Sequence, residues 1–98
     1  MVILKGEVDL ESSPSAREIL LRSVAGAEKV LVDLSGVTYI DSSGVASLVE
    51  ALQASKKNGT RFGLAAASEP TRRVLELARL DKVFTMYTTV DEGLSTQA

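Results

Sequence analysis

The chain has 98 residues and a formal net charge of −2, with 45% hydrophobic and 24% charged residues. This length and balance predict one globular domain over residues 1–98. The charge argues against a nucleic-acid-binding protein, because phosphate binding needs a concentrated basic surface. No apolar run approaches the ~20 residues that cross a bilayer, so we expect no direct insertion into a membrane.

The sequence contains neither cysteine nor histidine. Disulfides and thiolate chemistry are therefore excluded, as are a Ser-His-Asp triad and a histidine metal site. Phosphate-binding P-loop and G-x-S-x-G nucleophile motifs do not occur either. We expect a protein that is not an enzyme and has no catalytic residue, metal or cofactor. The opening MVILK is too short for a signal peptide, so the cytoplasm is the default location.

The N-terminal part of the chain predicts a strand followed by a helix. Residues 1–9 have strand character, and Gly6 marks a bulge or bend. Residues 12–26 predict a helix that has Ser13 as its N-cap and Pro14 at its first position. Its apolar stripe comprises four residues, Ala16, Ile19, Leu20 and Val24.

The middle of the chain predicts a buried strand and a well-defined helix. Residues 29–34 form a near-continuous apolar run, typical of a strand covered on both faces, which continues to Asp41. The next helix has apolar residues at positions i, i+3, i+4 and i+7, namely Val45, Leu48, Val49 and Leu52. Asn58 and Gly59 end this helix.

The C-terminal part repeats the alternation. Residues 61–67 predict a strand, and residues 68–80 a helix that turns Val74, Leu77 and Ala78 inward. A short strand is expected within 82–87, followed by about one helical turn and a frayed end. The whole pattern predicts a small α/β sandwich, in which helices pack on a mixed, mostly parallel sheet of about four strands.

The sequence Asp41-Ser42-Ser43-Gly44 stands between a predicted strand and a predicted helix. Helix capping alone would explain it, with a Ser42 or Ser43 hydroxyl accepting hydrogen bonds and Asp41 favouring the positive end of the helix. The same position also suits a phosphate on a serine, because a helix N-terminus tolerates negative charge. The four residues by themselves leave both interpretations open.

Three segments carry a resemblance to a known family, "GEVDL", "VLVDLSGVTYIDSSGVASLVEAL" and "EPTRRVLELARLDKVF". Together they resemble the STAS domain family of sulfate transporters and anti-sigma-factor antagonists. For the antagonists, the resemblance implies that an anti-sigma factor, a serine kinase, phosphorylates the first serine of D-S-S-G, here Ser42. The unphosphorylated antagonist binds the kinase and frees the sigma factor for transcription, and a phosphatase resets the switch. Residues 41–44 would then form the partner-binding surface.

The resemblance leaves two further matters open. The family has another strand before its "GE-x-D" strand, so the first strand of this chain is expected at a sheet edge, where a homodimer could form by strand pairing. A shorter sheet whose edge is guarded by Lys5 is the simpler alternative. The family also includes STAS subunits of membrane transporters of the lipid-trafficking ABC type, in which the serine need not be phosphorylated.

Overall fold

The computed structural model describes residues 1–95, in which strands and helices alternate along the chain. The strands are β1 (Val2–Val8), β2 (Lys29–Ile40), β3 (Arg61–Ala65) and β4 (Thr85–Tyr87). The helices are α1 (Ser13–Val24), α2 (Ser42–Asn58), α3 (Glu69–Leu77) and α4 (Val90–Ser95). The frayed end predicted for the last residues falls on 96–98, outside the described part.

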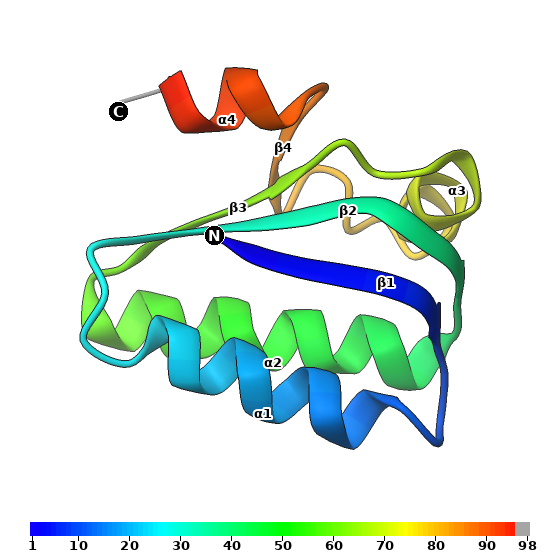
Figure 1. Ribbon diagram of the computed structural model, residues 1–98, viewed down its shortest axis with the longest axis horizontal. Helices are drawn as coiled ribbons and strands as arrows, with labels where there is room; N and C mark the ends of the chain where they lie inside the picture. Colours follow the sequence, from blue (N-terminus) through cyan, green and yellow to red (C-terminus); the bar gives the residue numbers. More distant parts are fainter. Residues whose placement is uncertain (96–98) are drawn as a thin grey trace.

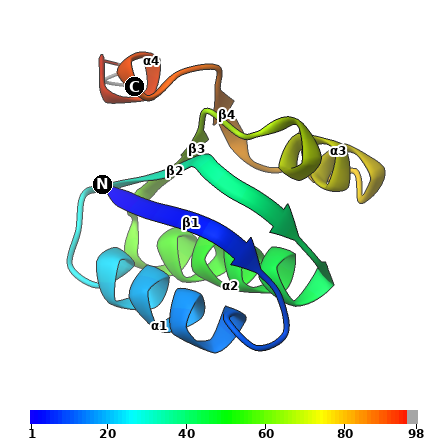
Figure 2. The ribbon, with the colours of Figure 1, turned by 45° about the vertical axis from the view of Figure 1, so that its right-hand side comes forward.

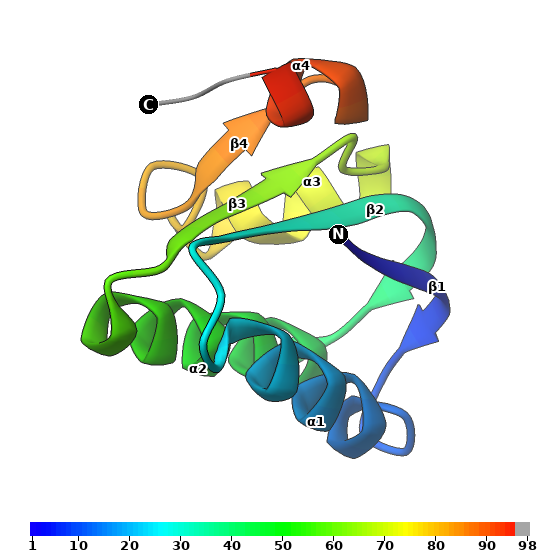
Figure 3. The same cartoon turned by 60° about the vertical axis from the view of Figure 1, so that its left-hand side comes forward.

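One four-stranded sheet with the order β1-β2-β3-β4 organises the molecule. All three strand pairings are parallel, so the predicted α/β sandwich is confirmed, and its sheet has no antiparallel pairing within residues 1–95. Helices α1 and α2 lie side by side on one face, and α3 and α4 lie beyond the other (Figures 1 and 3). No helix among the described residues is long and apolar enough to cross a membrane.

The edge strand β1 is irregular, as its glycine predicts. Gly6 has φ +73°, and the register with β2 shifts on either side of the Lys5–Gly6 pair. Glycine adopts this left-handed conformation without the steric cost that a Cβ imposes. As expected, β1 forms one edge of the sheet.

Most of the core lies between the sheet and the α1–α2 layer, and Leu75 of α3 and Phe84 complete it. The sequence predicted most of the residues that the two helices contribute to this core, since three residues of the apolar stripe of α1 and three of that of α2 are buried. These residues are Ala16, Leu20 and Val24 of α1, and Val45, Leu48 and Leu52 of α2. Val49 is half-buried, whereas Ile19 is 50% exposed, because α1 turns only a narrow stripe toward the sheet.

Some predictions for helices α1 and α3 are wrong. Helix α1 starts at Ser13 rather than after it, so Ser12 is its N-cap residue and Pro14 lies one position further in. Leu77 and Ala78 were expected to point inward, yet Leu77 is 80% exposed, and Ala78 follows the last residue of the helix and is exposed as well. Helix α3 instead buries Thr71 and Leu75, and Leu77 ends the helix on another side.

Candidate functional site at the β2–α2 junction

Asp41 connects the end of β2 to the start of α2, at the edge of the sheet where parallel strands present their carboxyl ends. Figure 2 shows β1 and β2 pointing the same way, toward the ends from which α1 and α2 begin. The backbone N–H of Asp41 donates to the carbonyl oxygen of Val8 over 3.2 Å. The junction is thereby fixed to the end of the neighbouring strand. Ligands and partners of α/β sheets commonly bind at this edge.

The side chain of Asp41 is the N-cap of α2. Its Oδ1 accepts hydrogen bonds from the backbone N–H groups of Ser43, at 2.9 Å, and Gly44, at 3.1 Å. The prediction that a hydroxyl of Ser42 or Ser43 caps the helix is therefore wrong. Both serines already lie inside the helix, as its first and second residues, whereas a capping side chain belongs to the residue before the first turn.

The two serines differ in exposure, as the phosphorylation hypothesis requires. Ser42 is exposed, and its hydroxyl makes no hydrogen bond to any residue in the described part of the chain. Ser43 is half-buried. Of the four residues predicted to bind a partner, Ser42 is thus the one whose side chain faces solvent most fully.

Gly44 is buried where α2 meets the ends of β1 and β2. A Cβ at this position would lie 2.5 Å from the carbonyl oxygen of Val8 and 2.7 Å from Cγ1 of Ile40. Such distances are far inside van der Waals contact, so only glycine fits without a shift of the backbone. Gly44 therefore sets the closeness of α2 to the sheet and so the position of Ser42.

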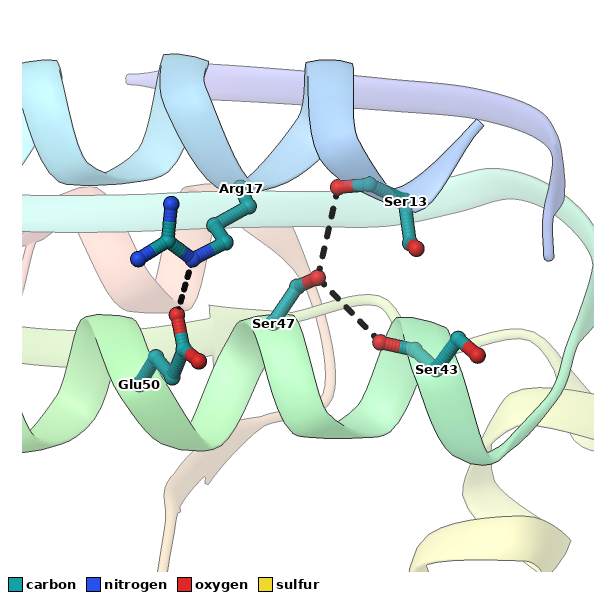
Figure 4. A network of polar contacts seen from close by, with 5 residues as sticks. All are labelled: Ser13, Arg17, Ser43, Ser47 and Glu50. Atoms are coloured by element: carbon teal, nitrogen blue, oxygen red, sulfur yellow. Dashed lines mark hydrogen bonds and ion pairs between the residues drawn. The ribbon is translucent and has the colours of Figure 1, made fainter. Parts of the chain in front are cut away.

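Beneath the junction, Ser47 joins the first turns of α1 and α2. Its Oγ lies 3.3 Å from the carbonyl oxygen of Ser13 and 3.2 Å from that of Ser43 (Figure 4). One turn further along, Arg17 and Glu50 form an exposed ion pair between the same two helices. Sequence reasoning missed this link. Its only signal was a serine, Ser47, placed beside Leu48 on the buried side of α2.

The loop from β1 to α1 is held by another aspartate that sequence reasoning missed. Oδ1 of Asp9 accepts hydrogen bonds from the backbone N–H groups of Ser12 and Glu11, both over 3.1 Å. These hydrogen bonds, and chiefly the one from the Ser12 N–H, lower the pKa of the Asp9 carboxyl below its ordinary value of 3.8. Hydrogen bonds between the Asp9 side chain and the backbone therefore fix this loop, which lies at the same carboxyl end of the sheet as Ser42.

The chemistry available at the junction is that of one exposed hydroxyl beside a carboxylate. No group of three or more acidic, cysteine or histidine side chains able to hold a metal ion occurs within residues 1–95. The carboxylate of Asp41 is engaged by two backbone N–H groups, which gives it a structural role. The arrangement therefore suits a site that is modified or bound by another protein.

Comparison with known proteins assigns this arrangement to a family. The family model for the STAS domain matches residues 1–93, which is nearly the whole chain. This chain belongs to the STAS domain family. The resemblance noted in the sequence is thus confirmed, and with it the fold.

The STAS proteins most informative here are anti-sigma-factor antagonists. The anti-sigma-F factor antagonist RsfB of Mycobacterium tuberculosis is 32% identical over 91 residues, which cover 92% of this chain and 74% of RsfB. The crystal structure of an anti-sigma factor antagonist from Mycobacterium paratuberculosis is 32% identical and superposes with a TM-score of 0.85 over 95% of this chain and 80% of that one. An anti-sigma-factor antagonist (STAS) domain protein from Planctomyces limnophilus is 29% identical, with a TM-score of 0.80 over 88% of this chain and 76% of that one.

Proposed function

We propose that this STAS domain is an anti-sigma-factor antagonist that works by partner switching. With Ser42 unphosphorylated, it binds an anti-sigma factor serine kinase and so frees a sigma factor. Phosphorylation of Ser42 by that kinase releases the antagonist, and a phosphatase restores it. In this role the protein is a regulatory binding partner in the cytoplasm and not an enzyme.

The observation that carries the proposal is the exposure of Ser42 at the first position of α2. A kinase must reach the hydroxyl of its substrate, and a partner must contact the residue whose modification it senses. The Ser42 hydroxyl meets both conditions, because it is not used by the fold. The names of the relatives support the same role.

The hydrogen bonds of Asp41 explain why a phosphate there would act strongly. A helix N-terminus attracts anions through its free N–H groups, but two of those on α2 already bind the Asp41 carboxylate. A phosphate on Ser42 adds about −1.5 to −2 charges next to that carboxylate. The modified surface is therefore strongly negative, and a partner shaped for a neutral hydroxyl must desolvate that charge to bind.

A phosphorylation assay with the purified cognate kinase tests the proposal. Incubation with ATP is expected to place one phosphate on Ser42, identified by mass spectrometry of the peptides. Ser42→Ala should accept none, whereas the matched variant Ser43→Ala should still be phosphorylated at Ser42. Phosphate on another residue, or none on the wild type with an active kinase that binds it, would contradict the switch.

A STAS subunit of a membrane transporter is the alternative function. In that role the junction would serve as a docking surface without phosphorylation. Co-purification with a permease or ATPase, together with an unmodified Ser42, would favour it.

A further inference from the structure

A groove runs between the end of β2 and helix α3, with a volume of about 460 Å³. Its walls are mainly apolar and comprise Tyr39, Ile40, Pro70, Val74 and Leu77. Glu69 and Arg73 also line it, and they form an exposed ion pair of 3.3 Å one helical turn apart. The groove thus has apolar walls with a charged pair among them, which is the composition of a protein-binding surface with a polar rim.

Leu77 is the unusual residue of this groove. Helix α3 already packs Leu75 into the core with no exposed surface, yet it leaves 80% of Leu77 accessible to solvent. Tyr39, across the groove on β2, is 49% exposed. Large apolar side chains that gather at a hollow on the surface mark an interaction site more often than isolated ones do.

One end of the groove lies near Ser42, the proposed phosphorylation site. Ile40 lines it and is the last residue of β2, and Ser42 follows two residues later. Consecutive Cα atoms are 3.8 Å apart, so the two positions are separated by at most about 7.6 Å. A protein interface of ordinary size centred on Ser42 would therefore extend to the end of the groove at Ile40.

The size of the groove indicates how it is used. A specific protein interface buries about 800 Å² on each partner, which is far more than a hollow of this size can contribute. The groove is therefore one anchor within a larger contact. The neighbouring surface that would complete that contact is the junction at Ser42.

We propose that this groove receives an apolar side chain of the same anti-sigma factor kinase that contacts Ser42. The inference rests on the proposed function and extends it by adding an anchor point that carries no charge switch. Buried apolar anchors of this kind contribute a large share of the affinity in many interfaces. The anchor should therefore contribute to binding whether or not Ser42 is phosphorylated.

Binding of the purified cognate kinase to four variants tests this inference by titration calorimetry. The variants are Leu77→Ser, Leu94→Ser, Ser42→Asp, and the combination of Leu77→Ser with Ser42→Asp. Leu94 is the matched control, since it is an exposed leucine on α4, away from the groove, and is 51% accessible. Leu77→Ser is expected to raise Kd about fivefold or more, and Leu94→Ser less than twofold. Because the anchor carries no charge switch, Leu77→Ser should also weaken binding in the Ser42→Asp background.

The outcomes separate this inference from the function on which it rests. If the wild type binds no anti-sigma factor kinase from its own genome, the proposed function fails and the anchor falls with it. If the wild type binds and Leu77→Ser binds equally tightly, only the anchor is overturned. Sedimentation velocity provides the remaining check: a wild-type dimer that Leu77→Ser converts to a monomer would assign the groove to a second copy of this chain instead. A circular dichroism spectrum like that of the wild type will show that Leu77→Ser is folded.

Discussion

Gly44 of α2 lies directly against Val8, the last residue of β1, so closely that a Cβ would come within 2.5 Å of the Val8 carbonyl oxygen. The contact places the first turn of α2, and Ser42 with it, at the ends of the two neighbouring strands. It explains in physical terms why the serines of the junction are followed by glycine.

Gly44→Ala should therefore destabilise the protein by about 1–3 kcal/mol, because the methyl group meets rigid backbone. Helix propensity alone would favour alanine by about 1 kcal/mol, so a net loss would report the close contact. Urea denaturation of both proteins measures the difference. Gly36→Ala is the matched control, since its nearest neighbour is the flexible side chain of Lys5 at 3.2 Å, and it should change stability by less than about 1 kcal/mol. Equal effects of the two substitutions would contradict the interpretation.

The cap of α2 gives a second prediction. Asp41→Ala should cost about 0.5–2 kcal/mol, the usual cost of losing an N-cap side chain, whereas Ser43→Ala should cost less than about 0.5 kcal/mol. Asp41→Asn should stay close to the wild type, because asparagine caps helices about as well as aspartate. Thermal and urea unfolding of the three variants measure these differences. A larger loss of stability for Ser43→Ala than for Asp41→Ala would mean that Ser43, and not Asp41, caps the helix.

The core of the α1–α2 layer gives a third prediction with an internal control. Leu48 is 1% exposed, so Leu48→Ala should cost about 2–5 kcal/mol of unfolding free energy. Ile19 has the helical spacing of a core residue but is 50% exposed, so Ile19→Ala should cost much less. Equal losses would mean that α1 is rotated relative to the structure described here.

The sequence predicted those parts of the fold that depend on short-range patterns along the chain. The positions of the helices were predicted from hydrophobic periodicity and from residues that end a helix. Val45, Leu48 and Leu52 are buried as their spacing predicts, and Gly59 ends α2 with φ +71°. These features depend on the local chain, which the sequence displays directly. The alternation of strands and helices similarly predicted a sheet with parallel pairings.

The wrong predictions concern features that depend on contacts between elements far apart in the sequence. Nothing in the sequence distinguishes Asp41 from the two serines as the cap, since all three are good capping residues. Which of them caps the helix depends on where β2 ends, and the backbone hydrogen bond from the Asp41 N–H to the Val8 carbonyl oxygen helps to fix that point. Leu77 likewise has the spacing of a core residue, but α3 contacts β2 along the side that carries Thr71 and Leu75. The candidate site at Ser42 was predicted through a family resemblance, whereas the exposure of Ser42 could be shown only by the structure.

Asp9 gives a prediction about pH. Its pKa is lowered in the folded protein, mainly by the Ser12 backbone N–H, so the folded state favours the ionised carboxyl. The resulting stability is present above the ordinary pKa of 3.8 and is lost as the pH falls through the lower folded value. Unfolding free energy measured across this acidic range should fall less steeply in Asp9→Asn than in the wild type. Identical slopes would show that the hydrogen bonds of Asp9 contribute nothing measurable.

The last prediction concerns the charge switch at Ser42. At about 7 Å and an effective dielectric of 20–80, a phosphate and the Asp41 carboxylate repel each other by roughly 1–4 kcal/mol. The fold should survive this repulsion, because Ser42 is exposed and its hydroxyl is not used in the fold. Ser42→Asp should therefore keep a native circular dichroism spectrum and weaken binding of the cognate kinase at least tenfold, or about 1.4 kcal/mol. Ser42→Ala should bind the kinase like the unphosphorylated wild type and remain bound in the presence of ATP.

Ser15→Asp is the matched control for this charge, because Ser15 is an exposed serine in the first turn of the neighbouring helix α1. It adds the same net charge in the first turn of a helix and should change the kinase Kd by less than about threefold. If Ser15→Asp and Ser42→Asp weaken binding equally, the effect is one of overall charge and Ser42 is not the switch. If neither weakens it while the wild type binds tightly, the kinase does not sense charge at this edge of the sheet. A selective loss with Ser42→Asp would locate the switch at the single hydroxyl that this junction exposes.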